Sequence, residues 1–216
     1  SGQTEKSSVV LIHTSVDLTK GESGYGVAWK QPDNIVTVLH LVAGKPQILV
    51  SWNNKQSFAK IKKIHKDADL ALLELQTPLG VPALEIYQGN PPADRPLNYW
   101  ETPKNTFKMD GKQTRLNFDK GAIPLRQLSN RISQDPKNLA KFAITLCPDG
   151  PKSYPLLEAN VFNFDEPNVA KSHSGSPLTY NGRIVGMVDG GVKPLGGKSV
   201  VWAIPAAQYF EKLFSA

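Results

Sequence analysis

Three residues of this sequence have the types and the chain order needed for catalysis by an activated serine. His40 closes an apolar run, Asp69 immediately precedes another, and Ser174 lies in the segment Ser-His-Ser-Gly-Ser-Pro-Leu at 172–178. A serine hydroxyl becomes a nucleophile when a histidine takes its proton and a carboxylate orients that histidine. Small residues around the serine let backbone N–H groups converge on a developing oxyanion. Together the three motifs predict acyl-transfer chemistry.

Each motif has a structural alternative when it stands alone. A histidine at the end of an apolar strand is usually a core residue, an aspartate before a strand can end a turn, and a Ser/Gly segment can be a turn. The order His40, Asp69, Ser174 is what distinguishes the set, because it is the chymotrypsin order and differs from the orders in subtilisin and α/β-hydrolases. Asp67 is the alternative acid. We prefer Asp69 because it directly abuts the apolar run.

Short β-strands are the elements that must position these residues. Runs rich in Val, Ile, Leu and aromatic residues are bounded by Gly, Pro, Asn or Asp, which is typical of strands separated by turns. In the first half they lie at 8–12, 25–29, 34–42, 47–52, 59–65 and 70–75. In the second half they lie at 98–101, 114–118, 140–147, 156–162, 176–180, 183–188 and 199–204. Such regular spacing predicts small antiparallel barrels.

A Pro- and Gly-rich stretch at 78–96 separates the two sets of strands. We therefore expect two domains: 1–92, a barrel carrying His40 and Asp69, and 93–216, a barrel carrying Ser174. The polar segment 123–141 is expected to hold one or two helical turns. A helix should close the chain from Pro205, with its apolar residues on one face. The predicted fold class is all-β, with small antiparallel barrels, a C-terminal helix and a site in the cleft between the barrels.

Composition excludes several other classes of protein. Hydrophobic residues make up 40% and charged residues 20%, and no apolar run approaches the length of a membrane helix. The net charge of +6 is dispersed, and the local cluster Lys60, Lys62 and Lys63 has no interleaved aromatic residues, so we expect no nucleic-acid partner. The single Cys147 cannot form an internal disulfide and is expected to be a buried thiol.

The motifs resemble those of the trypsin-like peptidases, and in particular of the bacterial HtrA-type branch. The matching stretches are Ser-Gly-Tyr-Gly-Val at 23–27, Val-Thr-Val-Leu-His at 36–40, Asp-Leu-Ala-Leu-Leu at 69–73, Ser-His-Ser-Gly-Ser-Pro at 172–177, Asn-Gly-Arg-Ile-Val-Gly-Met at 181–187 and Trp-Ala-Ile-Pro at 202–205. The resemblance covers roughly 20–76 and 156–214, and residues 95–155 show no match. It implies a chymotrypsin-like double barrel of two six-stranded antiparallel barrels, and a serine endopeptidase with a polypeptide substrate and no cofactor.

The resemblance also implies a role for each matching residue. Ser174 would be the nucleophile, His40 the general base and then acid, and Asp69 the residue that orients His40. The backbone N–H groups of Ser172 and Ser174 would form the oxyanion hole. Substrate-binding positions would be Asn168 near the floor of the primary specificity pocket, Asp189 in its wall, and Gly190 and Gly191 along the strand that pairs with the substrate backbone.

The sequence departs from the family pattern at three positions. Ser172 stands where the family usually has Gly, His173 where it has Asp or Asn, and Asp189 where a Ser often lies beside the triad acid. We expect the charge of Asp189 to modify the His40–Asp69 pair or the substrate preference. With His173 at its position, no buried ion pair with a new N-terminal amine can form, so activity should not depend on N-terminal cleavage.

Two other functions stay open from the sequence. The altered Ser172 and His173 motivate a catalytically impaired binding protein on the same fold, and the same site could belong to an esterase-like hydrolase. The histidines at 13, 65 and 173 lack a zinc-binding spacing, so no metal site is expected. No segment resembling a PDZ domain follows the catalytic unit. A periplasmic or secreted location is expected by analogy with the bacterial branch.

Overall fold

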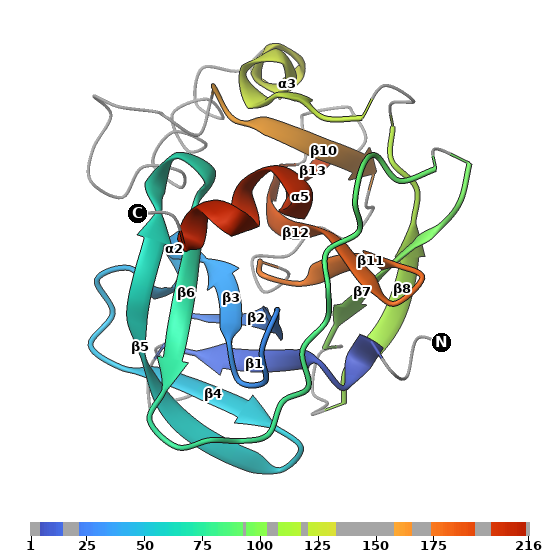
Figure 1. The fold of residues 1–216 in the computed structure, drawn as a ribbon. Coiled ribbons are helices and arrows are strands. Elements are labelled where there is room, and N and C mark those ends of the chain that lie inside the picture. The colour runs from blue at the N-terminus through green and yellow to red at the C-terminus, as the bar shows by residue number, and fades with distance from the viewer. Residues whose placement is uncertain are drawn as a thin grey trace.

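A computed structural model describes residues 5–14, 22–92, 94–102, 108–117, 121–132, 158–165, 174–192 and 200–214. The first half is a closed antiparallel barrel whose strand order is β1-β2-β3-β6-β5-β4. Its strands are β1 (Val9–His13), β2 (Ser23–Ala28), β3 (Ile35–Val38), β4 (Ile48–Trp52), β5 (Lys55–His65) and β6 (Leu70–Leu75). Figure 1 shows this barrel in blue to teal, below and to the left.

The second half is a sheet of seven strands in the order β8-β7-β11-β12-β13-β10-β9. These strands are β7 (Leu97–Glu101), β8 (Asp110–Thr114), β9 (Ile123–Pro124), β10 (Asn160–Asp165), β11 (Pro177–Tyr180), β12 (Arg183–Val192) and β13 (Val200–Pro205). The helix α3 (Leu125–Ile132) follows β9, and α5 (Ala206–Tyr209) with η4 (Phe210–Leu213) closes the chain. This architecture confirms the predicted all-β fold. It differs from the prediction in that the second half is a seven-stranded sheet rather than a six-stranded barrel.

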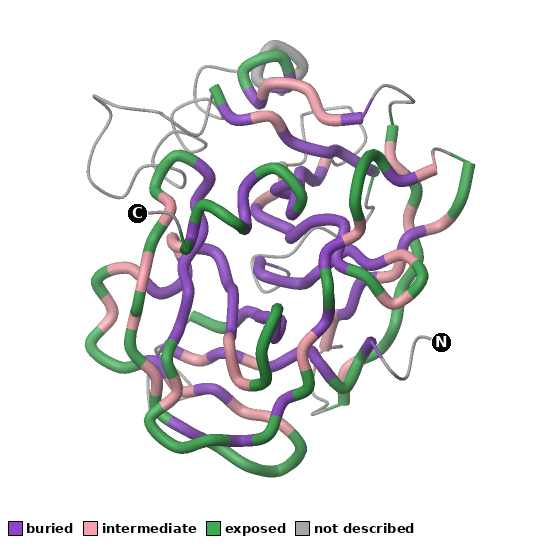
Figure 2. Tube along the Cα trace, viewed as in Figure 1, coloured by how far each residue is buried: buried purple, intermediate pink, exposed green. Residues whose placement is uncertain are grey.

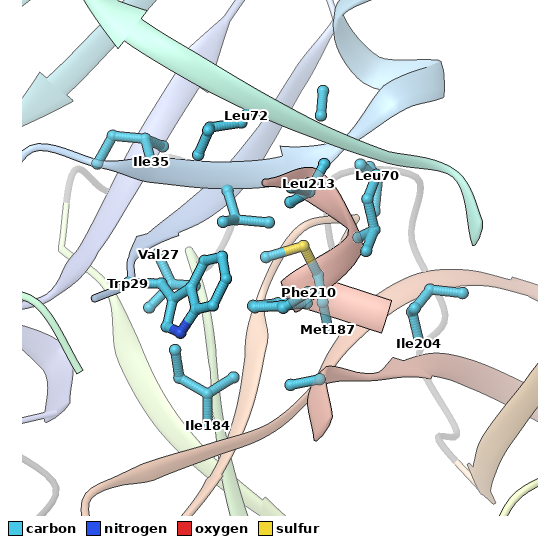
Figure 3. Close-up of a cluster of buried hydrophobic side chains, with 14 of the residues drawn as sticks. Val27, Trp29, Ile35, Leu70, Leu72, Ile184, Met187, Ile204, Phe210 and Leu213 are labelled. Atoms are coloured by element: carbon cyan, nitrogen blue, oxygen red, sulfur yellow. The ribbon is translucent and has the colours of Figure 1, made fainter. Parts of the chain in front are cut away.

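The two halves share a continuous hydrophobic core, so that neither is packed alone. Strands β3 and β13 are buried along almost their whole length, whereas the long β5 alternates between more and less exposed residues. Buried segments concentrate at the centre of the molecule (Figure 2). Leu70 and Leu72 of β6, Met187 of β12, and Phe210 and Leu213 of η4 belong to one cluster (Figure 3). One face of the C-terminal helices packs on this core, while Gln208, Glu211 and Lys212 on the opposite face are exposed.

The connection after β6 is extended and is held by both halves. Leu84 forms an isolated parallel bridge with Trp29 beside the barrel, and Ile86 forms another with Ile184 of the sheet. The carboxylate of Asp33 accepts hydrogen bonds from three successive backbone N–H groups of this connection, at residues 79–81. The predicted linker is therefore held in place by hydrogen bonds to both halves.

Several predicted elements differ from the structure at their ends. The expected strand at 34–42 stops at Val38, and α2 (Leu39–Val42) follows it. The strand expected at 114–118 is β8, which ends at Thr114. The strand expected at 140–147, with Cys147, lies outside the described residues. Among the described residues, no helix is long and apolar enough to cross a lipid bilayer.

Candidate active site

His40 and Asp69 are brought together by two short turns that face each other across the barrel rim. Strand β3 ends at Val38, and His40 lies in the first turn of α2. Asp69 ends the 3₁₀ turn η1 (Lys66–Ala68) in a left-handed conformation, with φ 54° and ψ 44°. Aspartate is one of the few residues that adopts this conformation readily. The conformation turns the Asp69 carboxylate toward α2.

Three hydrogen bonds fix the His40–Asp69 pair. The backbone N–H of Leu39 donates to the Asp69 carbonyl over 2.8 Å, and the backbone N–H of His40 donates to Asp69 Oδ1 over 2.8 Å. The ring nitrogen Nδ1 of His40 donates to Asp69 Oδ2 over 2.5 Å. With Nδ1 protonated, Nε2 is left as the acceptor, which is the tautomer that a general base needs.

Ser174 lies in a tight turn before β11 that is held by strands of both halves. The Tyr25 N–H of β2 donates to the Ser174 carbonyl over 2.9 Å, and the Gly175 N–H donates to the Val188 carbonyl of β12 over 2.8 Å. Gly175 has φ +89°, and a Cβ there would lie 1.8 Å from the Tyr25 carbonyl oxygen. Only glycine fits this position, so the Ser-Gly pair in the sequence is required by the approach of β2.

The turn places the Ser174 hydroxyl beside His40. Ser174 Oγ lies 3.3 Å from His40 Nε2 and 3.2 Å from the backbone carbonyl oxygen of Asp189. Catalytic hydrogen bonds are often long without substrate and tighten in the complex. Ser174 is 7% exposed and His40 is half-buried, so the hydroxyl lies at the edge of the solvent-accessible surface. The structure thus brings together the three residues that the sequence singled out.

Asp189 lies directly behind this group. It is the extra residue of a β-bulge in β12, between the pairs Val188 with Ala203 and Gly190 with Trp202. Bulges re-aim side chains and recur next to active sites. Asp189 is 0% exposed, and its Oδ2 accepts a hydrogen bond from the indole Nε1–H of Trp202 over 2.7 Å.

Burial perturbs both carboxyl groups behind His40. It raises the pKa of Asp69 to about 6, against hydrogen bonds from Asp189 and from the His40 backbone that lower it. Burial, followed by the neighbouring negative charge of Asp69, raises the pKa of Asp189 well above its usual range. At neutral pH, Asp69 is therefore the more acidic member of the pair.

One cluster among the described residues has side-chain atoms close enough to hold a metal ion. His40, Asp69 and Asp189 each offer one atom within 4.8 Å of the others. The hydrogen on His40 Nδ1 already occupies part of this space, because it is donated to Asp69. We therefore interpret the cluster as a hydrogen-bonded network.

The other site residues predicted from the sequence have different environments in the structure. Asp189 was expected in the wall of a substrate pocket, but its side chain is turned into the interior. Gly190 and Gly191 lie on β12 opposite Trp202 and Val201 of β13. Asp67, the alternative acid, is exposed. The predicted positions Asn168, Ser172 and His173 lie outside the described residues.

Sequence reasoning missed the residues that support the site. Trp202 and Tyr25 were read only as strand residues, although one bonds Asp189 and the other holds the nucleophile turn. Gly190 makes room for the indole, because a Cβ there would lie 2.6 Å from the Trp202 ring. The signal that could have identified this arrangement is the Asp-Gly pair in an apolar strand, since such a glycine often marks a bulge.

Comparison with known proteins identifies the fold. No family model matches the chain, and no curated protein matches its sequence. Among solved structures, the active form of the Rv3671c protease from M. tuberculosis superposes with a TM-score of 0.69 at 21% identity, over 98% of this chain and 82% of that one. The serine endoprotease from Yersinia pestis gives 0.66 at 18% identity, over 99% and 66% of the two chains.

The MamO protease domain from Magnetospirillum magneticum is similar over 99% of both chains, with a TM-score of 0.68 at 16% identity. At these identities the similarity establishes the fold, whereas the chemistry depends on the residues of this chain. The closed barrel, the second antiparallel sheet and the C-terminal helix agree with these structures. The chain therefore has the chymotrypsin-like fold of the trypsin-like serine proteases.

Proposed function

We propose that this chain is a serine endopeptidase that hydrolyses peptide bonds through an acyl-enzyme. The observation that carries the proposal is the continuous contact from Asp69 through His40 to Ser174, with distances of 2.5 and 3.3 Å. The two residues of the His–Asp pair come from the barrel, and the serine comes from the sheet. The convergence of these three polar side chains is not explained by packing, because apolar residues would pack at least as well in their place.

In this mechanism His40 Nε2 takes the Ser174 proton as Oγ attacks the substrate carbonyl carbon. The tetrahedral intermediate collapses as His40 gives that proton to the leaving amine, and water then hydrolyses the acyl-enzyme by the same steps. Asp69 keeps Nδ1 protonated and stabilises the imidazolium that forms in each half-reaction. Backbone N–H groups at Ser172 and Ser174 would bind the oxyanion. An uncharged Asn168 at the pocket floor would favour an uncharged residue before the cleaved bond.

A fluorophosphonate probe tests the proposal, because it reacts with an activated serine without requiring a known substrate. The native chain should be labelled, Ser174→Ala should not be labelled, and His40→Ala should lose about 10⁴-fold or more of the labelling rate. Ser23→Ala is the matched control. Ser23 Oγ lies 2.7 Å from His13 Nδ1, but this second Ser–His pair is exposed. Labelling that persists in Ser174→Ala would refute the assignment.

A binding protein without catalysis is the alternative, favoured by the departures at Ser172 and His173. Complete failure of the native chain to react with the probe would support it. Parallel panels of peptides and simple esters separate the endopeptidase from an esterase-like hydrolase. We expect peptide cleavage within a chain, with no added metal or cofactor.

A further inference from the structure

The buried Asp189 carboxyl cannot be accommodated as an ordinary carboxylate. Its Oδ2 is satisfied by the Trp202 indole, but no N–H or hydroxyl donor among the described residues points at Oδ1. An ionised carboxylate oxygen that is wholly removed from water and has no donor is strongly unfavourable. The same atom is satisfied at once if it carries a proton and acts as the donor.

The acceptor for that proton is already in place. Carboxyl oxygens of Asp69 and Asp189 lie within 4.8 Å of each other in the cluster with His40, and two buried carboxyl groups this close avoid mutual repulsion when one of them is protonated. Asp69 is committed as the anion because it accepts hydrogen bonds from both the backbone N–H and the ring Nδ1–H of His40. Within the part of the chain that the structure describes, Asp189 receives one donor, the indole. The proton therefore belongs on Asp189.

The other charges around Asp189 agree with this assignment. Asp69, from the turn before β6, and His40, from α2, are the titratable groups that face it among the described residues. Oδ1 lies 3.8 Å from His40 Nδ1, whose hydrogen is directed to Asp69 instead. From β13 the neighbour is the uncharged Trp202, and from the turn before β11 it is Ser174. Among the described residues, no lysine or arginine pairs with Asp189.

We propose that Asp189 is a neutral carboxylic acid whose Oδ1–H donates a hydrogen bond to the Asp69 carboxylate and so holds Asp69 in the ionised, oriented form that His40 requires. This role rests on the proposed function of the same site. Asp189 is a positioning residue, since it acts on the reaction through Asp69. Trp202 fixes the Asp189 carboxyl by its other oxygen, and Gly190 provides the space for the indole.

The role has a direct consequence for the dependence of catalysis on pH. Catalysis requires an ionised Asp69, so kcat/KM should rise with pH through the Asp69 pKa of about 6. When Asp189 itself loses its proton at alkaline pH, the donor disappears and a second negative charge is buried beside the imidazole. Without that donor, Asp69 is no longer held in the orientation that His40 requires, and kcat/KM should fall again.

Two near-isosteric variants isolate the donor in kinetic measurements. Asp189→Asn retains an N–H donor that cannot ionise, whereas Asp189→Leu retains volume without a donor. We expect Asp189→Leu to have a kcat/KM about 10- to 100-fold below that of Asp189→Asn, the effect of one hydrogen bond to a charged group. In Asp189→Leu, the rise of kcat/KM with pH should move to higher pH. In Asp189→Asn, the fall of kcat/KM at alkaline pH should be absent. Equal kcat/KM values and unchanged pH profiles in both variants would overturn the proposal.

A measurement on the native chain keeps the proposal testable if a variant does not fold or if the chain has no turnover. With aspartate labelled with ¹³C at the carboxyl carbon, the Asp189 resonance should have the chemical shift of a protonated acid at neutral pH. The resonance is assigned by its loss in Asp189→Asn, or by its proximity to the Trp202 indole proton in the native chain. An ionised Asp189 would refute the inference and leave the proposed function intact. A protonated Asp189 in a chain without probe reactivity would refute the proposed function alone.

Discussion

Replacing Asp189 by asparagine should make the protein more stable, and increasingly so as the pH rises. In the unfolded chain an aspartate ionises with a pKa of about 3.9. In the folded protein, burial raises the pKa of Asp189 well above that value. Between the two pKa values the folded state holds a proton that the unfolded state releases. Stability is therefore lost as pH rises through this window, by about 1.4 kcal/mol per pH unit for one group.

The size of the effect follows from the same relation. Within this window the native chain should lose about 1.4 kcal/mol for each pH unit relative to Asp189→Asn, whose amide does not titrate. Such a change is a large part of the 5–15 kcal/mol total that is typical of proteins. The raised pKa of Asp69 contributes to both chains with the same sign, so the difference between them reports Asp189.

Urea denaturation followed by tryptophan fluorescence, repeated at several pH values, measures this difference. Asp67→Asn, which removes an exposed carboxyl near the same turn, controls for the loss of one acidic side chain. The midpoint gap between Asp189→Asn and the native chain should widen steadily with pH. Parallel stability curves would mean that Asp189 is ionised in the folded protein, and the reasoning from its unpartnered oxygen would fail.

Three further substitutions test the supports of the site. Gly175→Ala should abolish probe labelling and destabilise the fold by at least about 2 kcal/mol in urea melts, because its Cβ would overlap the Tyr25 carbonyl at a positive φ. Gly190→Ala should displace the Trp202 indole, which near-ultraviolet circular dichroism detects, and shift the acid limb of the pH profile upward. Glu5→Ala should cost about 3 kcal/mol by leaving several buried donors unpaired, whereas Glu5→Gln should cost less.

Each of these has an outcome that would contradict it. Native labelling in Gly175→Ala would show that the turn before β11 tolerates a side chain. An unchanged indole signal in Gly190→Ala would mean that the ring does not depend on the missing Cβ. Equal stabilities of Glu5→Ala and Glu5→Gln would show that the acceptor oxygens at this position are not what matters.

The three residues that meet at the candidate site were predictable because local patterns identify them. Asp69 abuts an apolar strand and Ser174 precedes a Gly-Ser-Pro turn, and both signals lie within a few positions of the residue. The strands of the barrel were predictable for the same reason, since alternation and turn residues are local. The ends of the strands were less predictable. The run 34–42 is short and apolar, and periodicity alone does not distinguish a strand from a strand followed by a helical turn. The end of this strand is determined by the hydrogen bonds to Asp69, which lies 29 residues after His40.

The protonation state of Asp189 could not be predicted from the sequence. The family resemblance placed Asp189 near the triad acid, but we expected a charged side chain in the pocket wall that modifies the His40–Asp69 pair or the substrate preference. The bulge between Val188 and Gly190, and the crossing of β13, turn it inward. Burial of a carboxyl depends on segments distant in the chain, so no window around Asp189 contains the information.

The attachment of the Ser174 turn to Tyr25 has a consequence for the order in which the site is assembled. During synthesis the strands of the barrel, with His40 and Asp69, emerge before Ser174 does. The serine takes its shape only when its turn docks on β2, through the 2.9 Å bond from the Tyr25 N–H. A ribosome-bound or partly folded chain would therefore lack the proposed peptidase activity toward other proteins. The proposed activity would appear in a single late step, when the last strands and the C-terminal helices pack against the barrel.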